Sequence, residues 1–283
     1  MRITLALFVS VLALIRIAQA GLVEPADRVP GHPGVTYYDL MKQVVTDLEL
    51  NPQDTPTAHE VVPYRHIEGE KAKTVPASPL AIKYLEPLSI HADGAIRLAL
   101  MADLGGSDGD VTEFVLLALF DMTGKPKLLD VVEVGRDRLT GFGTPALTTL
   151  GNGTDLINVD SDHFNSNEDF VFNELLFVRN GHFELIDSVF TFNVKICTFA
   201  LTEDPSISTR LARGEHYRRI FLSIREQRKV TPDAASCDDK PPRSFVRNFH
   251  ATYRWDRRRG QFVAVNSNLK KLEAENERLM NPP

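Results

Sequence analysis

An acidic stretch between residues 160 and 169 holds the side chains best suited to chemistry. Hard oxygen ligands at alternating positions suit Ca²⁺, which takes six to eight oxygens at about 2.3–2.6 Å. The stretch is not an EF-hand loop, because the glycine and the glutamate of that motif are replaced by Asn165 and Val171. An ordered polar loop between strands is the simpler interpretation, since Asp and Asn favour turns. The candidate calcium ligands are Asp160, Asp162, Asn165, Asn167 and Asp169.

Three upstream carboxylates join this candidate site if the two loops meet at one sheet edge. They are Asp103, Asp108 and Asp110. His163 lies among the acids and is a candidate general base or metal ligand. No second histidine stands two or four residues away, so a hydrogen-bonding role is the simpler interpretation.

Residues 105–109 read Gly-Gly-Ser-Asp-Gly and satisfy the G-x-S-x-G pattern of serine hydrolases. In those enzymes the serine stands at a strand-to-helix turn, whereas here a strand-like sequence follows. Asp108 would also oppose the negative charge that develops in an oxyanion hole. A glycine-rich turn is therefore the preferred interpretation, and a hydrolase with Ser107 as its nucleophile is the alternative.

The two cysteines, Cys197 and Cys237, predict a disulfide. Their spacing lacks the C-x-x-C pattern of reactive or metal-binding pairs. In an oxidising compartment such a bridge would close a Pro- and Asp-rich loop.

The first twenty residues predict an export signal. Arg2 precedes an apolar run from Ile3 to Ile15, and Ala18-Gln19-Ala20 forms a cleavage site before Gly21. The run is too short for a hydrocarbon core of about 30 Å, and no later run approaches that length. We therefore expect a soluble periplasmic or secreted protein without a membrane span.

Charge is distributed unevenly along the chain, whose formal net charge is −6. Residues 91–190 hold 17 acidic against 6 basic residues, whereas residues 201–263 hold 8 acidic against 14 basic residues. The Arg-rich C-terminal third suggests an anionic envelope or extracellular partner. Mutual compensation of acidic and basic regions is the preferred interpretation, and an exported acidic protein is a poor candidate for nucleic-acid binding.

The pattern of apolar residues predicts a mainly β fold. Thr36 begins an amphipathic helix that Asn51-Pro52 ends, residues 51–80 form a Pro-rich extended wrapper, and residues 268–280 form a short charged helix. Between them, short β-rich runs separated by Gly, Asp and Asn indicate an antiparallel meander or curved sheet of hairpins. Residues 114–120 are continuously apolar and fit a central strand better than a buried helix.

Three strand–turn–strand units end their turns on Gly124, Gly181 and Gly260. Asn180-Gly181 predicts a type I′ hairpin turn. The irregular spacing favours three hairpins of one sheet over the blades of a β-propeller, which stays open as an alternative.

One short segment resembles a known family. Gly141-Phe142-Gly143, followed by Leu150 to Leu156, resembles a single FG-GAP-type propeller repeat, and that family binds calcium in an acid-rich loop. Residues 151–154 offer no carboxylate, so the resemblance transfers neither the metal site nor an adhesive role.

Together these patterns predict a signal peptide at 1–20, a helix and wrapper at 21–80, a β-rich domain at 81–267 and a charged helix at 268–283. The predicted function is that of a non-catalytic envelope or binding module of unknown ligand. The alternative is a hydrolase that uses Ser107 or a metal held around Asp160 to Asp169.

Overall fold

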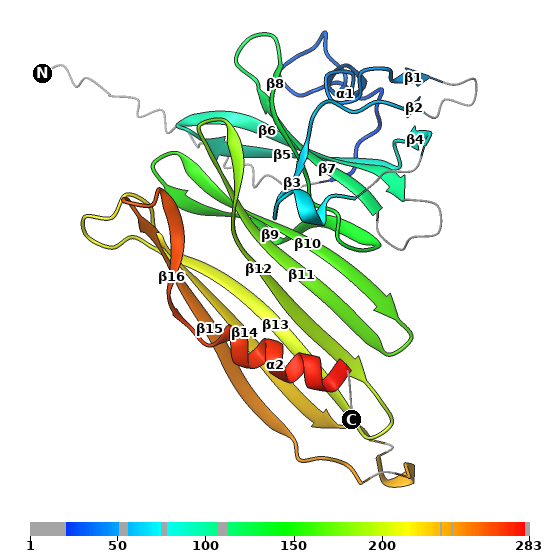
Figure 1. Cartoon of the computed structure of the whole chain (residues 1–283), viewed down its shortest axis with the longest axis vertical. Coiled ribbons are helices and arrows are strands. Elements are labelled where there is room, and N and C mark those ends of the chain that lie inside the picture. Colours follow the sequence, from blue (N-terminus) through cyan, green and yellow to red (C-terminus); the bar gives the residue numbers. More distant parts are fainter. Residues whose placement is uncertain are drawn as a thin grey trace, which may run out of the picture.

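The chain forms a stack of mainly antiparallel β-sheets. The computed structural model describes residues 21–50, 56–74, 78–106, 113–232, 234–238 and 240–280. The largest sheet has eight strands, each hydrogen-bonded to the next along the chain (Figure 1). These are β9 (Leu139–Gly151), β10 (Thr154–Asn165), β11 (Glu168–Arg179), β12 (His182–Lys195), β13 (Phe199–Arg210), β14 (Arg219–Val230), β15 (Phe245–Asp256) and β16 (Gln261–Ser267).

A second sheet contains five strands in the order β3-β8-β7-β6-β5. Its central strand holds the apolar run of residues 114–120, all seven of which are buried, so the strand prediction for that run is confirmed. A strand covered on both faces needs apolar side chains at every position. The members are β3 (Arg65–His66), β5 (Tyr84–Ala92), β6 (Ala95–Gly106), β7 (Glu113–Asp121) and β8 (Lys127–Glu133).

The N-terminal segment covers the outer face of the five-stranded sheet. A capping box between Thr36 and Asp39 starts helix α1 (Tyr37–Met41), as the sequence predicts. The helix is much shorter than predicted, because Val44 and Val45 leave it to pair with residues 61–62. The other short elements are β1 (Glu49–Leu50), β2 (Pro56–Ala58), β4 (Leu80–Ala81) and the 3₁₀ helix η1 (Glu70–Ala72).

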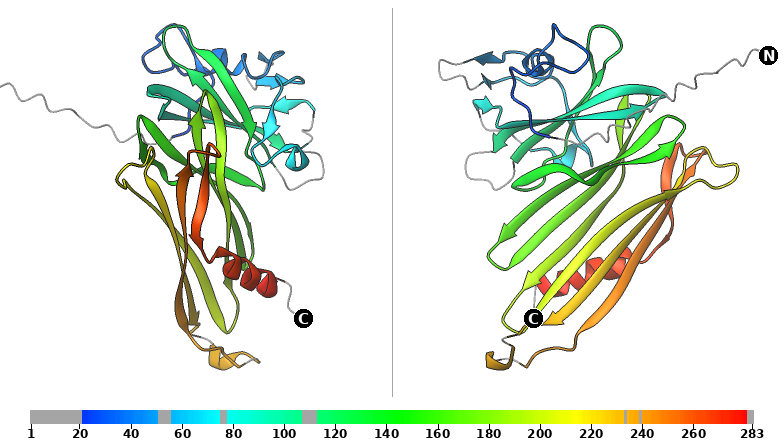
Figure 2. Two further views of the ribbon diagram at one scale, coloured as in Figure 1. Left: turned by 60° about the vertical axis from the view of Figure 1, so that its left-hand side comes forward. Right: turned by 180° about the vertical axis from the view of Figure 1, so that it is seen from behind.

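The eight-stranded sheet divides into two layers between β12 and β13 (Figure 2). These strands pair at Val194 with Leu201 and at Lys195 with Ala200. Past Val194 and Leu201, backbone N–H groups of the two strands bond to side chains instead of to the facing backbone. Glu203 N donates to Asn193 Oδ1 at 2.7 Å, and Phe192 N donates to Glu203 Oε2 at 2.9 Å.

Strands β9–β12 form the middle layer of the stack. On β11, Leu176 and Val178 pack with the five-stranded sheet, whereas Leu175 and Phe177 pack in a core that also contains Ile220 of β14. The middle layer therefore has apolar side chains on both faces, which explains the unbroken run Leu175 to Val178.

Three glycine turns join the two sheets at one end. Gly94 of the β5–β6 turn lies so close to Gly153 of the β9–β10 turn that a Cβ on Gly153 would lie 2.8 Å from Gly94 Cα. Asn180 and Gly181 both have positive φ, which agrees with the predicted hairpin turn. Their N–H groups donate to the Asp93 carboxylate at 3.0 and 2.8 Å.

The C-terminal part closes the stack. Helix α2 (Leu269–Met280) contacts β12 and β15, and it buries its own side chain Leu272. The predicted disulfide between Cys197 and Cys237 is confirmed, with 6.0 Å between the Cα atoms, and the loop it closes contains the 3₁₀ helix η2 (Ala234–Ser236). Within the described ranges, no helix has the length and apolar character needed to cross a membrane.

Candidate functional site

An acidic pocket lies where the five-stranded sheet meets the edge of the eight-stranded sheet. Its volume is about 380 Å³. Tyr84 and Glu86 come from β5, and the Tyr84 hydroxyl donates to the carbonyl of Thr140 on β9. The remaining lining residues are Leu22, Leu139, Gly141, Phe142, Gly143, Thr144, Asp160 and Asp162.

Gly143 makes room for the acidic side chains beneath the pocket. An added Cβ there would lie 2.0 Å from Asn158 Nδ2 and 2.5 Å from Asp160 Oδ2. Asn158 is only 3% exposed and its Oδ1 has no hydrogen-bond partner among the described residues. The same is true of Asp160 Oδ1. Both of these buried acceptor oxygens therefore lack a donor among the described residues, which is unusual in folded proteins.

Burial raises the pKa values of the carboxyls that line the pocket. Desolvation raises the pKa of Asp160 to about 6, although a hydrogen bond from Asn158 opposes the shift. Desolvation also raises the pKa of Asp162, and the nearby charges of Asp169 and Asp137 add to the effect. For Glu86, burial raises the pKa while the Phe142 N–H, which donates to Oε2 at 3.2 Å, opposes it.

A second group of acids continues behind the pocket. Burial, together with the charges of Asp103, Asp137 and Asp162, raises the pKa of Glu113 to about 7. Asp103 thus shares an electrostatic environment with Asp162, although the two are far apart in sequence. Asp108 and Asp110 lie outside the described residues.

The remaining predicted calcium ligands have partners of their own. Residues 160–165 continue strand β10 instead of forming a loop, so their side chains alternate between the two faces. Asn165 donates to Glu168 at 3.4 Å, and Asp169 accepts from Asn193 at 3.0 Å. Asn167 lies in the turn between β10 and β11. Within the described ranges, no set of three or more His, Cys, Asp or Glu side chains is arranged to hold a metal ion.

Of the two candidate catalytic residues, the structure describes His163 but not Ser107. The His163 Nδ1 lies 2.8 Å from Asp137 Oδ1, and its ring packs edge-on against Phe170. The carboxylate that contacts His163 is therefore Asp137, and no local sequence pattern indicates this pair because the two residues are distant along the chain. Ser107 lies outside the described residues.

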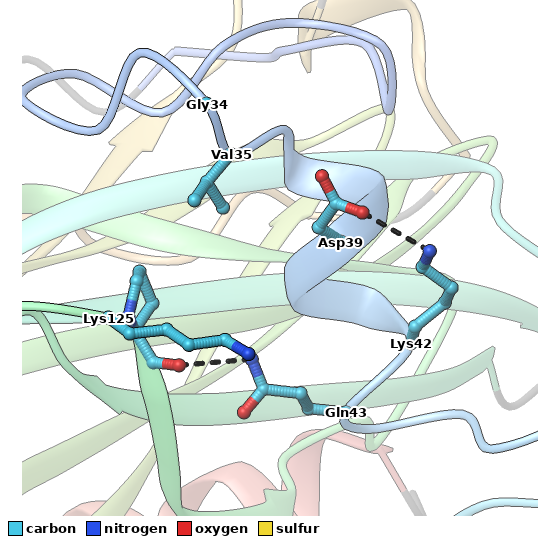
Figure 3. Close-up of a pocket in the computed structure, with 7 residues that line it drawn as sticks. Gly34, Val35, Asp39, Lys42, Gln43 and Lys125 are labelled. Carbon is cyan, nitrogen blue, oxygen red and sulfur yellow. Dashed lines mark hydrogen bonds and ion pairs between the residues drawn. The ribbon is translucent and has the colours of Figure 1, made fainter.

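Two other hollows differ from the acidic pocket in their lining residues. The largest, about 1090 Å³, is bounded mainly by apolar residues of the N-terminal segment, β5 and β6. A third, of about 570 Å³, lies between α1 and the β7–β8 turn (Figure 3). There Lys42 pairs with Asp39 of the same helical segment at 3.2 Å, whereas Gln43 donates to the Pro126 carbonyl at 3.3 Å and so ties the residues after α1 to the turn.

A basic face covers the outer side of β13, β14 and β15. Arg210 on β13 pairs with Arg219 on β14. Ile220 pairs with Tyr253 on β15, so the next residue, Arg254, lies beside Arg219 and the three arginines are neighbours. Glu215 neutralises Arg219 through bonds of 2.7–3.1 Å. We define the basic face by its exposed charged residues and the polar residues between them: Thr202, Asp204, Ser206, Ser208, Arg210, Ser223, Arg225, Lys229, Asn248, His250, Thr252 and Arg254.

Comparison of the chain with protein-family models, with curated proteins and with solved structures finds no match. The site residues are therefore interpreted from their geometry and chemistry alone.

Proposed function

We propose that this protein is an exported, non-catalytic binding module that attaches to a linear acidic polysaccharide through the basic face. The observation that carries the proposal is the charge of that face. It presents Arg210, Arg225, Lys229 and Arg254 against one acid, Asp204, although the whole chain is acidic. Such a local excess of positive charge attracts a polyanion and excludes cationic partners.

The shape and composition of the basic face favour an extended polymer over a small molecule. Antiparallel strands give a flat surface, and Arg225 and Lys229 lie four residues apart on β14, which corresponds to about 13 Å along the strand. Ser, Thr, Asn, Gln and His side chains lie between the charges, together with the apolar Phe221 and Val246. Hydroxyl and amide groups there match the hydroxyls of a sugar chain, while the arginines match its carboxylates.

The disulfide supports the export part of the proposal. A bridge between Cys197 and Cys237 persists in an oxidising compartment and is rare in the cytosol. N-terminal sequencing of the protein from its native source tests this part. A chain that starts at Gly21 supports it, and a chain that keeps residues 1–20 contradicts it.

Binding to polygalacturonate, with neutral dextran as the control polymer, tests the ligand class. We expect binding at low ionic strength that weakens steeply as salt is added, because exposed charges are screened within about 10 Å at 0.1 M salt. Replacing Arg225 and Arg254 together by serine should weaken binding about tenfold, which corresponds to roughly 1.4 kcal/mol.

A matched variant removes the same charge elsewhere. Arg28 and Arg138 are exposed and lie outside the basic face, so the Arg28→Ser/Arg138→Ser chain should bind like the wild type. Equal loss in both variants would show a non-specific charge effect. Equal binding to dextran and polygalacturonate would rule out recognition of an acidic polymer.

Calcium at Asp160 and Asp162 stays a prediction for the acidic pocket. Desolvated carboxylates favour a cation, and calcium should raise the melting temperature if it binds the folded chain. Ca²⁺ requires at least six oxygens, and the described carboxylates do not converge as a metal-binding group. A cation that needs fewer oxygen ligands therefore fits the pocket better.

A further inference from the structure

The N-terminal end of the described chain lies along the acidic pocket. Val23 forms an antiparallel bridge with Leu85, and its N–H donates to the Leu85 carbonyl at 3.0 Å. Residues 21–23 thus extend along the free edge of β5. Leu22, the next residue toward the N-terminus, lines the pocket, and Gly21 precedes it.

We propose that the acidic pocket is a binding site for an ammonium group, and that the processed chain fills it with its own α-amino group at Gly21. The inference depends on the export part of the proposed function, because cleavage after Ala20 creates this amine. Before cleavage, the nitrogen of Gly21 is an uncharged peptide nitrogen. After cleavage it carries a positive charge one residue before Leu22, which lines the pocket together with Glu86, Asp160 and Asp162.

The chemistry of the pocket matches an ammonium group. Its lining contains three carboxylates and no Lys or Arg among the described residues. The partnerless acceptor Asp160 Oδ1 requires a hydrogen-bond donor, and an ammonium group offers three N–H donors with one charge. The aromatic rings of Tyr84 and Phe142 belong to the same lining and suit a cation.

A metal ion fits the same place less well. Ca²⁺ is bound by six to eight oxygens, whereas the described carboxylates do not converge as a metal-binding group. An ammonium group needs only two or three acceptors. The proximity of Gly21, set by the pairing of Val23 with Leu85, also supplies the amine at high effective concentration.

Chains with defined N-termini test the proposal directly. Fusion proteins cleaved in vitro give one chain that starts at Gly21 and another that starts at Ala20, which places the amine one residue farther along. Reductive methylation with ¹³C-formaldehyde labels the α-amine, and NMR titration then reports its pKa. We expect the pKa in the Gly21 chain to lie at least one unit above the usual value of about 7.7–8.0, and the Ala20 chain to show the usual value.

Two variants of the Gly21 chain complete the experiment. Asp160→Asn/Asp162→Asn should return the α-amine to its usual pKa. Glu24→Gln/Asp27→Asn is the matched control, because these exposed acids lie close in sequence but outside the pocket, so the raised pKa should persist. If the double pocket variant fails to fold, the comparison of the Gly21 and Ala20 chains still decides the question.

The same α-amine pKa in the Gly21 and Ala20 chains would overturn the proposal. Equal stabilisation of both chains by calcium, lost in the pocket variant, would assign the pocket to a metal instead. These measurements use purified chains, so they do not depend on polysaccharide binding. Native sequencing that finds a start other than Gly21 would remove the proposed occupant, and a chain that keeps residues 1–20 would also contradict the predicted export signal.

Discussion

Gly143 shows how a missing side chain shapes the acidic pocket. The position has no unusual φ, so glycine is required there by space, not by backbone conformation. Asn158 and Asp160 occupy the volume that a side chain on β9 would fill. Residues 141–143 therefore resemble a propeller repeat in sequence only. Their two glycines belong to β9, an edge strand of the eight-stranded sheet.

Gly143→Ala should destabilise the fold by about 1–3 kcal/mol, because the new methyl group overlaps two buried polar side chains. Gly141→Ala is the matched control on the same strand, since its Cβ would meet Glu86 Oε2 at an ordinary 3.7 Å. Urea unfolding measures both variants. Equal stabilities would show that β9 shifts freely and that Gly143 does not define the pocket.

Helix α2 seals the place where the eight-stranded sheet divides. Asn276 donates to Glu203 Oε2 at 3.0 Å, and Arg247 joins Glu226 of the sheet to Glu275 of the helix. Glu203 is 2% exposed, and burial raises its pKa to about 7, with the charges of Glu226 and Glu275 adding to the shift. The helix is therefore held by polar contacts whose strength depends on pH.

Replacing Glu203 by glutamine should remove part of the pH dependence of stability. The folded state binds the Glu203 proton more tightly than the unfolded state does, so the carboxyl lowers stability as pH rises from 4.5 to 7. Glu203→Gln keeps the hydrogen-bonding shape, and we expect it to gain about 1–3 kcal/mol over the wild type at pH 7.5 and little at pH 4. Denaturant unfolding at both pH values measures the gain, and Glu273→Gln on the exposed side of α2 is the control.

The apolar side of α2 gives a second test at this scale. Leu272 is 1% exposed and Leu279 is 37% exposed. Leu272→Ala should cost about 2–4 kcal/mol, because it leaves a cavity, whereas Leu279→Ala should cost less than about 1 kcal/mol. Equal small losses in thermal unfolding would mean that α2 contributes little to the core.

The whole molecule is a stack in which the middle layer, β9–β12, shares one core with each neighbour. The disulfide lies at the far end of this stack, where β12 turns into β13 and the loop before β15 returns. It therefore restrains the region from which the two layers of the eight-stranded sheet diverge.

Removing the bridge should lower stability without changing the fold. Cys197→Ser/Cys237→Ser opens a loop of 40 residues, which corresponds to at most about 4 kcal/mol in the loop-entropy model. Urea unfolding with and without reductant measures the effect, and reductant should weaken only the wild type. A wild type that does not respond to reductant would show that the bridge does not restrain the chain.

Three features follow from the sequence alone: the alternation of apolar residues indicated the β-rich class, Asn180-Gly181 indicated its hairpin, and the two cysteines indicated the disulfide. These signals act between near neighbours or through a single covalent bond. Strand β13 escaped detection, since Pro205 and polar residues facing outward conceal its pattern. Only the tertiary structure decided that α1 is short, that Asp137 pairs with His163, and that β5 approaches β9 and β10 to form the acidic pocket. Contacts between residues so distant in the chain depend on how whole sheets pack, and no local pattern records that packing.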